Sequence, residues 1–295
     1  MSIDERNFRS AYYEKVGFKS VEEKKSLEIL LKDQQLECSK LKLFCLRFSV
    51  TASYRKRVWK LLLGVLPMNS ECHEFVMDQR RQEYHDLLRA LQVMRMIDST
   101  TPKPQQFFAM WLLQFGKMHS KTNINVDSNF IPITQTVLSI FDDEKDTESY
   151  WVSKCFYDTV LKFEGDIPKL IEISWSIIER EESILFKYLY NMGVFEFLPL
   201  EKWFGSCFAE ILHQSALVRI WDKICGGSYK ILVFVFAVMV LNQKHCLIKA
   251  TKSEDVLKCL SQIPEKTADV IVTKSIEMWQ HNGSPLTVYD KPKPS

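Results

Sequence analysis

The residues able to do chemistry are scattered along this chain of 295 residues. The sequence contains no Walker phosphate loop, no H-E-x-x-H zinc motif and no G-x-S-x-G nucleophile turn. Cys72 and His73 are adjacent, but neighbours on a helix point about 100° apart and make a poor nucleophile–base pair. Arg219 and Asp222 have a spacing that suits a buried ion pair or a helix cap better than catalysis. We therefore expect no cofactor and no metal site.

The cysteines show neither C-x-x-C pairs nor nearby histidines at zinc spacing. Most lie in amphipathic patterns, where a free cysteine acts as a small hydrophobic residue. This usage predicts reduced thiols in a cytoplasmic protein. The opening run MSIDERNFRS has no apolar stretch and no glycine after Met1, so we expect neither a secretory signal nor myristoylation. The eight cysteines are Cys38, Cys45, Cys72, Cys155, Cys207, Cys225, Cys246 and Cys259.

Composition favours a soluble helical fold. Hydrophobic residues make up 46% of the chain and charged residues 26%, which is ordinary for a globular protein. The formal charge is +2 without a long basic run, so nucleic acid binding has no electrostatic footprint. Glycine and proline, at 9 and 10 residues, are sparse enough to favour long helices over strands.

The stretch from Trp203 to Leu241 organises the predicted fold. Apolar residues recur at helical spacing over 203–212 and again over 217–224, before the glycine pair at 226–227. The next segment, 231–241, is apolar on every side, which predicts the central helix of a helical core. The alternative of a membrane span needs roughly 20 apolar residues and is disfavoured by this length.

The same periodicity predicts an all-α fold with one multi-helix domain over residues 21–283. We expect residues 1–20 to pack on the body of that domain and residues 284–295, rich in proline and lysine, to form a disordered tail. The remaining predicted helices are 20–31, 36–48, 54–63, 70–97, 130–141, 150–163, 167–190 with a break at 179–182, 253–260 and 267–279.

The central stretch also resembles a known family, the TBC domains of Rab GTPase-activating proteins. The resemblance to their C-terminal half rests on Trp203-Phe204, Phe208, the run Arg219-Ile220-Trp221-Asp222, the glycine pair and the aliphatic helix after it. Arg55, Trp59 and the run Leu61 to Gly64 resemble the opening R-x-x-x-W-x-x-L-L-G helix of that family. The resemblance covers most of the chain and implies the all-α TBC fold.

Catalytic TBC domains use an arginine finger in an I-x-x-D-x-x-R motif, which neutralises charge on the transferred phosphoryl group. If Asp98 is the motif aspartate, Thr101 occupies the finger position, and in a register one residue later Pro102 does. The sequence has no arginine between Arg95 and Arg180, so a shift of the alignment cannot supply one.

The family's second finger is a glutamine in a Y-x-Q-G motif. The corresponding segment, 117–149, has no glycine, and its single glutamine, Gln135, reads as an ordinary helix-surface residue. An arginine finger contributes about 10³ to 10⁵ in rate, or about 4 to 7 kcal/mol of transition-state stabilisation. Losing both fingers predicts a protein without TBC-type catalysis. The alternative is a Rab GTPase-activating protein with unconventional catalytic residues.

The resemblance extends to the branch of the family that serves as a subunit beside hamartin and tuberin. It rests on the runs RNFRSAYYEKVGFKSVEEKKSLEILLKD and SYKILVFV. This resemblance implies binding to the hamartin coiled coil, with tuberin reached through the complex, as the activator of the GTPase Rheb that restrains the target-of-rapamycin kinase. A Rab GTPase is a further expected partner. The expected location is the cytoplasm, with peripheral recruitment to lysosomal or vesicle membranes.

The predicted helix over 70–97 carries more apolar surface than one buried stripe requires. At 100° per residue, Tyr84 and Leu91 fall on a face that we assign to the core, together with Leu87, Leu88 and Met94. Val93, Met96 and Ile97 fall on the opposite side. They form a candidate partner-binding strip on which a partner helix would lie. The alternative is that a neighbouring helix or the loop at 99–104 covers them.

Overall fold

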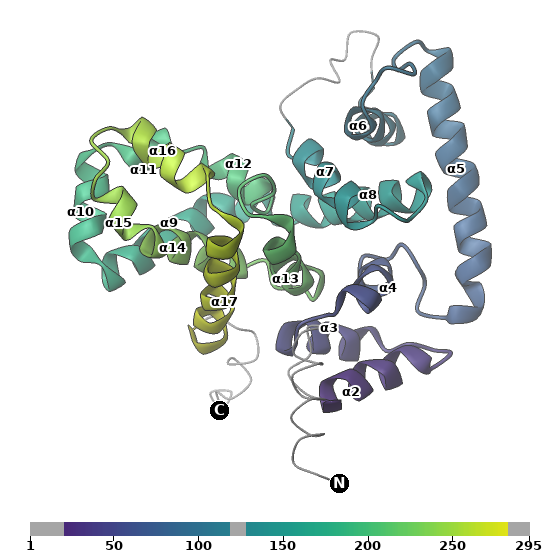
Figure 1. The fold of residues 1–295 in the computed structure, drawn as a ribbon. Coiled ribbons are helices and arrows are strands. Elements are labelled where there is room, and N and C mark those ends of the chain that lie inside the picture. The colour runs from purple at the N-terminus through teal and green to yellow at the C-terminus, as the bar shows by residue number, and fades with distance from the viewer. Residues whose placement is uncertain (1–20, 119–127, 283–295) are drawn as a thin grey trace, which may run out of the picture. The chain divides into compact units, whose positions relative to one another are not determined.

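The computed structural model describes residues 21–118 and 128–282 and is built from helices (Figure 1). Within these ranges the β pairing is limited to an isolated bridge between Gln35 and Asn69. The all-α expectation is therefore confirmed. The expected N-terminal segment and C-terminal tail lie outside the described residues, so their domain boundaries stay predictions. The chain divides into two compact units, 1–159 and 160–295, which are treated separately below.

Three helices open the first unit: α2 (Val21–Lys32), α3 (Cys38–Arg47) and α4 (Ala52–Leu62). Their apolar faces meet because leucines and phenylalanines recur at helical spacing on each of them. The predicted helices at 36–48 and 54–63 are confirmed within the few residues by which helix ends vary. The buried residues of this cluster include Leu27, Leu31, Leu41, Phe44, Cys45, Val58 and Leu61.

The arginine and tryptophan of the opening block hold α4 in place. The Arg55 guanidinium donates to the Val50 carbonyl, and the buried ring of Trp59 lies 6.3 Å from the ring of Phe141 and 6.4 Å from that of Phe156. Gly64 follows the helix with a φ of +76°, in the left-handed region that glycine adopts without a Cβ penalty. These residues therefore pack α4 against the rest of the unit and end the helix.

A short 3₁₀ turn (Ser70–Cys72) leads into α5 (His73–Val93), and α6 (Lys103–Gln114), α7 (Phe130–Ile140) and α8 (Asp146–Leu161) follow. The sequence analysis did not predict α6. The Arg80 guanidinium of α5 lies 4.4 Å from the ring centre of Trp151 on α8, and the Trp151 indole N–H donates to the Arg80 carbonyl at 3.1 Å. These paired contacts fix α5 against α8.

The long helix ends at Val93, so the prediction that it continues to Ile97 is wrong. Arg95 adopts a left-handed φ of +56° and donates its backbone N–H to the Gln92 carbonyl at 3.0 Å. Met96 donates to the Leu91 carbonyl at 3.0 Å. These two bonds form a Schellman motif, which terminates a helix and turns the chain away from its axis.

The same motif corrects the prediction of a helix over 203–212. Helix α12 (Leu200–Gly205) stops where Cys207, with a φ of +52°, donates to the Phe204 carbonyl at 3.0 Å. Phe208 then donates to the Trp203 carbonyl at 2.8 Å. Residues 206–212 are therefore a compact turn whose single aromatic side chain, Phe208, is buried.

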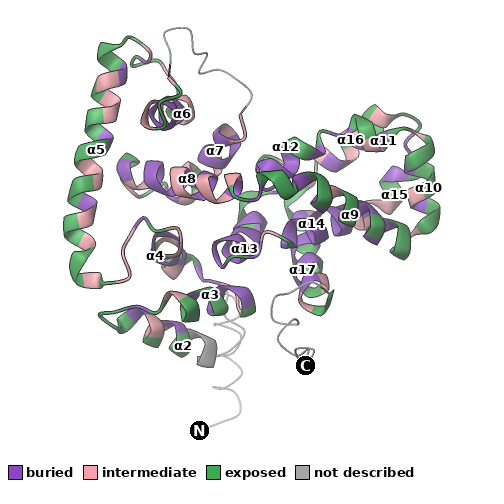
Figure 2. Ribbon diagram, turned by 180° about the vertical axis from the view of Figure 1, so that it is seen from behind, coloured by how far each residue is buried: buried purple, intermediate pink, exposed green. Residues whose placement is uncertain are grey.

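In the second unit, helix α14 (Ile231–Asn242) lies at the centre, as predicted. Its residues from Ile231 to Val240 are all buried (Figure 2). It packs against α9 (Ile167–Glu181), α13 (Gln214–Cys225) and α17 (Glu265–Asn282). The unit also contains α10 (Ser183–Asn191), α11 (Val194–Phe197), α15 (Lys244–Leu247) and α16 (Ser253–Ser261). The predicted break near residue 182 separates α9 from α10.

Arg219 and Trp221 connect α13 to its surroundings. The Arg219 guanidinium donates to Asp269 at 3.4 Å and to Thr273 at 3.1 Å, both on α17. Instead of the expected buried ion pair, Arg219 makes an exposed contact with the neighbouring helix. The indole N–H of Trp221 donates to the Cys207 carbonyl at 3.0 Å. This bond links α13 to the turn after α12.

Within the described ranges, no helix has both the length and the apolar character needed to cross a membrane.

Trp221→Ala tests the core of the second unit. The Trp221 side chain is 0% exposed, so its removal leaves a large cavity and should cost about 3 to 5 kcal/mol of unfolding free energy. The measurement is denaturant unfolding followed by circular dichroism. Phe75→Ala is the matched control, because Phe75 is 68% exposed, and it should change stability by at most about 0.5 kcal/mol. Equal stability of the two variants would contradict the core position of Trp221.

Candidate functional site

A closed polar turn stands where the sequence placed the arginine finger. One oxygen of Asp98, Oδ1, accepts hydrogen bonds from the Thr100 backbone at 2.8 Å and the Thr100 hydroxyl at 2.6 Å. The same oxygen accepts from the backbone and hydroxyl of Thr101 at 3.0 and 3.1 Å, and the Asp98 N–H donates to Thr101 Oγ1 at 3.0 Å. Thr101 is thus part of the turn itself.

These bonds stabilise the charged carboxylate. Hydrogen bonds from the Thr100 hydroxyl, the Thr100 backbone and the Thr101 hydroxyl hold the pKa of Asp98 below its ordinary value. The turn is anchored on one side by buried Ile97 and on the other by α6, whose first turn contains Pro104. The loop is therefore ordered by its own side chains.

Two cations, Lys103 and Arg95, lie close to this turn in the sequence. Lys103, at the start of α6, forms an ion pair with Asp146 at the start of α8. Arg95 is exposed and lies on the left-handed residue of the Schellman motif, three residues before Asp98. Burial, with a smaller contribution from the charge of Asp146, raises the pKa of nearby Tyr84 to about 12. Tyr84 therefore stays neutral at ordinary pH and cannot act as a base.

Gln135 lies on the exposed face of α7. The opposite face of the helix carries buried Phe130, Ile133 and Val137. The interpretation of Gln135 as a helix-surface residue agrees with this position. Part of the segment expected to carry the glutamine motif, residues 119–127, lies outside the described residues. In the ranges that the structure does describe, no group of three or more histidine, cysteine or acidic residues could hold a metal ion.

The predicted partner-binding strip does not form one helix face. Val93 is 76% exposed, but Met96 is half-buried and Ile97 is only 6% exposed. The physical reason is the Schellman motif, which ends α5 at Val93 and directs the following residues toward the interior. The alternative, that neighbouring structure covers the strip, is correct for Ile97. A binding role for Val93 stays a prediction.

A different set of α5 residues shares a face with Val93. Phe75 and Val93 are 18 residues apart, which is about five turns of 3.6 residues, and both are exposed. Gln82, Asp86 and Arg89 lie between them within 40° of the same line and are exposed as well. We call these five residues the α5 outer stripe. The sequence analysis missed Phe75, although the 18-residue spacing was a readable signal.

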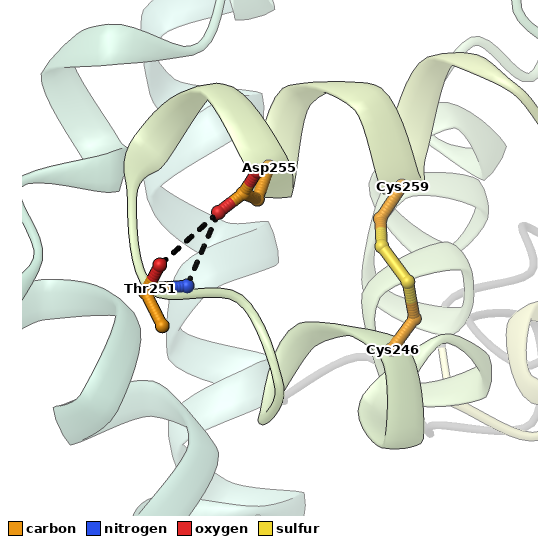
Figure 3. Close-up of a disulfide and its surroundings, with 4 residues drawn as sticks. All are labelled: Cys246, Thr251, Asp255 and Cys259. Carbon is orange, nitrogen blue, oxygen red and sulfur yellow. Dashed lines mark hydrogen bonds between the residues drawn. A yellow bond between two sulfur atoms is a disulfide. The ribbon is translucent and has the colours of Figure 1, made fainter.

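A disulfide joins Cys246 of α15 to Cys259 of α16 (Figure 3). The expectation that all eight cysteines are reduced is wrong for this pair. The two residues are separated by 13 positions, and the connection between α15 and α16 brings their Cα atoms within 6.4 Å, inside the range that a disulfide spans. Cys38, Cys72 and Cys207 are free thiols.

The architecture is that of a GTPase-activating domain of the Rab type. The crystal structure of the Ypt/Rab-GAP domain of Gyp1p superimposes with a TM-score of 0.67 at 16% identity and covers 88% of this chain and 98% of its own. At that identity the likeness establishes the fold alone. No family model matches the sequence.

Sequence comparison gives the family. TBC1 domain family member 7 of Bos taurus is 40% identical over 287 residues, covering 96% of this chain and 97% of that protein. The Xenopus tropicalis protein of the same name is 42% identical over 293 residues, covering 97% of this chain and 99% of that protein. The chain belongs to the TBC1 domain family.

Thr101→Val tests the turn at Asp98. The folded-state pKa of Asp98 lies below the ordinary value of about 3.9, so the turn's contribution to stability is complete above that value and is lost as pH falls through the lowered pKa. Removing the Thr101 hydroxyl should raise the pKa of Asp98 toward the ordinary value, as measured by carboxyl NMR titration. Thr136→Val is the control, since that hydroxyl donates to the Pro132 carbonyl on α7. An unchanged Asp98 titration in Thr101→Val would refute the assigned bonds.

Proposed function

We propose that this chain is a non-catalytic TBC-domain subunit that binds the hamartin coiled coil and supports the hamartin–tuberin complex. In that complex, tuberin activates the GTPase Rheb and thereby restrains target-of-rapamycin signalling. The observation that supports the proposal is the closed Asp98 turn, in which Thr101, the residue expected from the sequence at the finger position, is hydrogen-bonded to Asp98. Recruitment to lysosomal or vesicle membranes belongs to the same proposal and would come through the complex.

The Asp98 turn supports a loss of catalysis with retention of fold. Arginine at the finger position would supply a positive charge that a threonine hydroxyl cannot replace. The nearest lysine in sequence, Lys103, is already paired with Asp146. The loop needs no bound GTPase to be ordered, because its own side chains satisfy its polar groups. This arrangement suits a domain whose groove no longer performs phosphoryl transfer.

The α5 outer stripe supports the choice of a helical partner. From Phe75 to Val93 the stripe covers 18 residue steps, or about 27 Å at 1.5 Å per residue, which is long enough to lie alongside several turns of another helix. Apolar residues stand at its two ends, Phe75 and Val93, and charged residues of both signs stand between them. Side chains of this kind flank the apolar seam in coiled coils and set the choice of partner.

A panel of GTP-loaded Rab proteins tests the absence of catalysis. Purified wild-type protein should stimulate phosphate release by less than about tenfold, a barrier change of about 1.4 kcal/mol. Thr101→Arg restores the finger side chain but breaks the Asp98 turn and leaves the glutamine position empty, so it should remain inactive too. Clear stimulation by the wild type would favour the alternative, a Rab GTPase-activating protein with unconventional residues. Activity of Thr101→Arg alone would show that the groove is otherwise intact.

Val93→Asp tests the partner surface. A carboxylate at this exposed position costs little folding free energy in the free protein, so the melting temperature should be unchanged. When a partner helix covers the position, the carboxylate loses its water without gaining a hydrogen-bond partner. Binding to the hamartin coiled coil should therefore be abolished. Calorimetric titration with the purified coiled coil measures the affinity.

Two variants control this experiment. Ile184→Asp changes an equally exposed residue on α10, 79% exposed, and should leave binding intact. Ile97→Asp places a charge in the core and should lower stability instead of acting on binding alone. Wild-type affinity in Val93→Asp would remove the α5 outer stripe from the interface.

A further inference from the structure

The Cys246–Cys259 disulfide stands in the wall of a cavity of about 550 Å³ in the second unit. This volume is in the range of small-molecule sites. Cys246 is exposed and Cys259 is half-buried, so the sulfur pair is accessible on the Cys246 side. The cavity is also lined by Gln243, Lys249, Lys258 and Gln262.

The charges around this cavity favour an anionic ligand. Lys249 and Lys258 are exposed and have no ion pair among the described residues, so both ammonium groups are available. The one acidic residue in the lining, Asp255, directs its carboxylate to the start of α16. There it accepts from the backbone N–H of Thr251 at 3.3 Å and from the Thr251 hydroxyl at 3.4 Å (Figure 3). It also accepts from the backbone N–H of Lys252 at 3.3 Å.

The helices that carry the two cysteines are held in place independently of the disulfide. Lys244 at the start of α15 donates to Glu182 at 2.7 Å, and the Ser253 hydroxyl at the start of α16 donates to the Met192 carbonyl at 2.9 Å. The Tyr188 hydroxyl donates to the Ala250 carbonyl between the two helices. Opening the disulfide therefore leaves the cavity wall in place.

We propose that Cys246 and Cys259 form a thiol–disulfide exchange site for a small anionic thiol of the glutathione class. The two carboxylates of such a thiol would pair with Lys249 and Lys258, and the two glutamine amides could bind its peptide groups. This combination places the thiol of the ligand beside an accessible disulfide sulfur.

The exchange proceeds in two nucleophilic steps. The ligand thiolate attacks Sγ of Cys246, the disulfide bond breaks, and its electron pair leaves on Sγ of Cys259, which takes a proton from water. A second ligand thiolate then attacks the ligand sulfur of the mixed disulfide. This step releases the ligand's own disulfide and the Cys246 thiolate. In total two ligand thiols are oxidised and the protein disulfide is reduced, and the ligand disulfide is the oxidant for the reverse reaction.

The test compares glutathione with the neutral thiol 2-mercaptoethanol on the full chain, with intact-mass and peptide analysis of acid-quenched samples. Glutathione should give a mixed disulfide at Cys246. The double variant Lys249→Glu/Lys258→Glu should slow the glutathione reaction about tenfold and change the mercaptoethanol reaction by less than about twofold, because only the anionic thiol is attracted by the lysines.

Cys72, a free and exposed cysteine outside the cavity, is the internal control in the reverse reaction with glutathione disulfide. Its modification should not respond to the lysine changes.

Salt gives a second readout on the wild type, in case the double variant fails to fold. Raising the ionic strength should slow the glutathione reaction relative to the mercaptoethanol reaction, since exposed charges are screened. A disulfide that merely clips two helices would react with both thiols in a ratio unaffected by salt or by lysine charge. Such a constant ratio, or attachment of glutathione at Cys259 instead of Cys246, would overturn the proposal.

Discussion

The burial of α14 is the constraint on which the second unit depends. Every residue from Ile231 to Val240 is buried, so the helix has no face for water and needs neighbours on all sides. Helices α9, α13 and α17 supply them, each with an apolar face toward α14 and a polar face outward. Polar side chains then join the surrounding helices to one another, as Arg219 joins α13 to Asp269 on α17. The run from Arg219 to Asp222 thus contributes to packing, with Arg219 bonded to α17 and Trp221 buried in the core.

In the first unit, polar groups that could have served catalysis instead satisfy one another. Oδ1 of Asp98 accepts hydrogen bonds from Thr100 and Thr101, and Lys103 is paired with Asp146. On the proposed function, the groove of a GTPase-activating domain has kept its loop geometry while its charge has been replaced by a hydroxyl. Retention of such a loop is physically reasonable because Ile97 before it and α6 after it are packing elements of the unit.

The sequence predicted the helices wherever periodicity was strong, including the isolated apolar helix at 231–241 and the break at residue 182 that separates α9 from α10. It failed at two helix ends, after Val93 and after Gly205. Both are Schellman motifs whose left-handed residues, Arg95 and Cys207, are not the glycine that normally signals such an end.

The Cys246–Cys259 pair was missed for another reason, because only the fold brings residues 13 positions apart into bonding distance. The sequence offered Thr101 as a candidate finger position, but it did not predict the hydrogen bonds that Thr101 makes with Asp98.

The Schellman motif at Arg95 separates two surfaces that the sequence analysis had merged. Before it, α5 is straight and regular, and its outer stripe runs from Phe75 to Val93. After it, Met96 and Ile97 turn inward, and the chain re-emerges in the Asp98 turn. The proposed partner surface and the Asp98 turn are therefore joined by two backbone hydrogen bonds and one left-handed residue. Because of this turn, a partner helix can lie along the outer stripe without meeting the buried residues that anchor the finger loop, so binding at α5 requires no change in the loop.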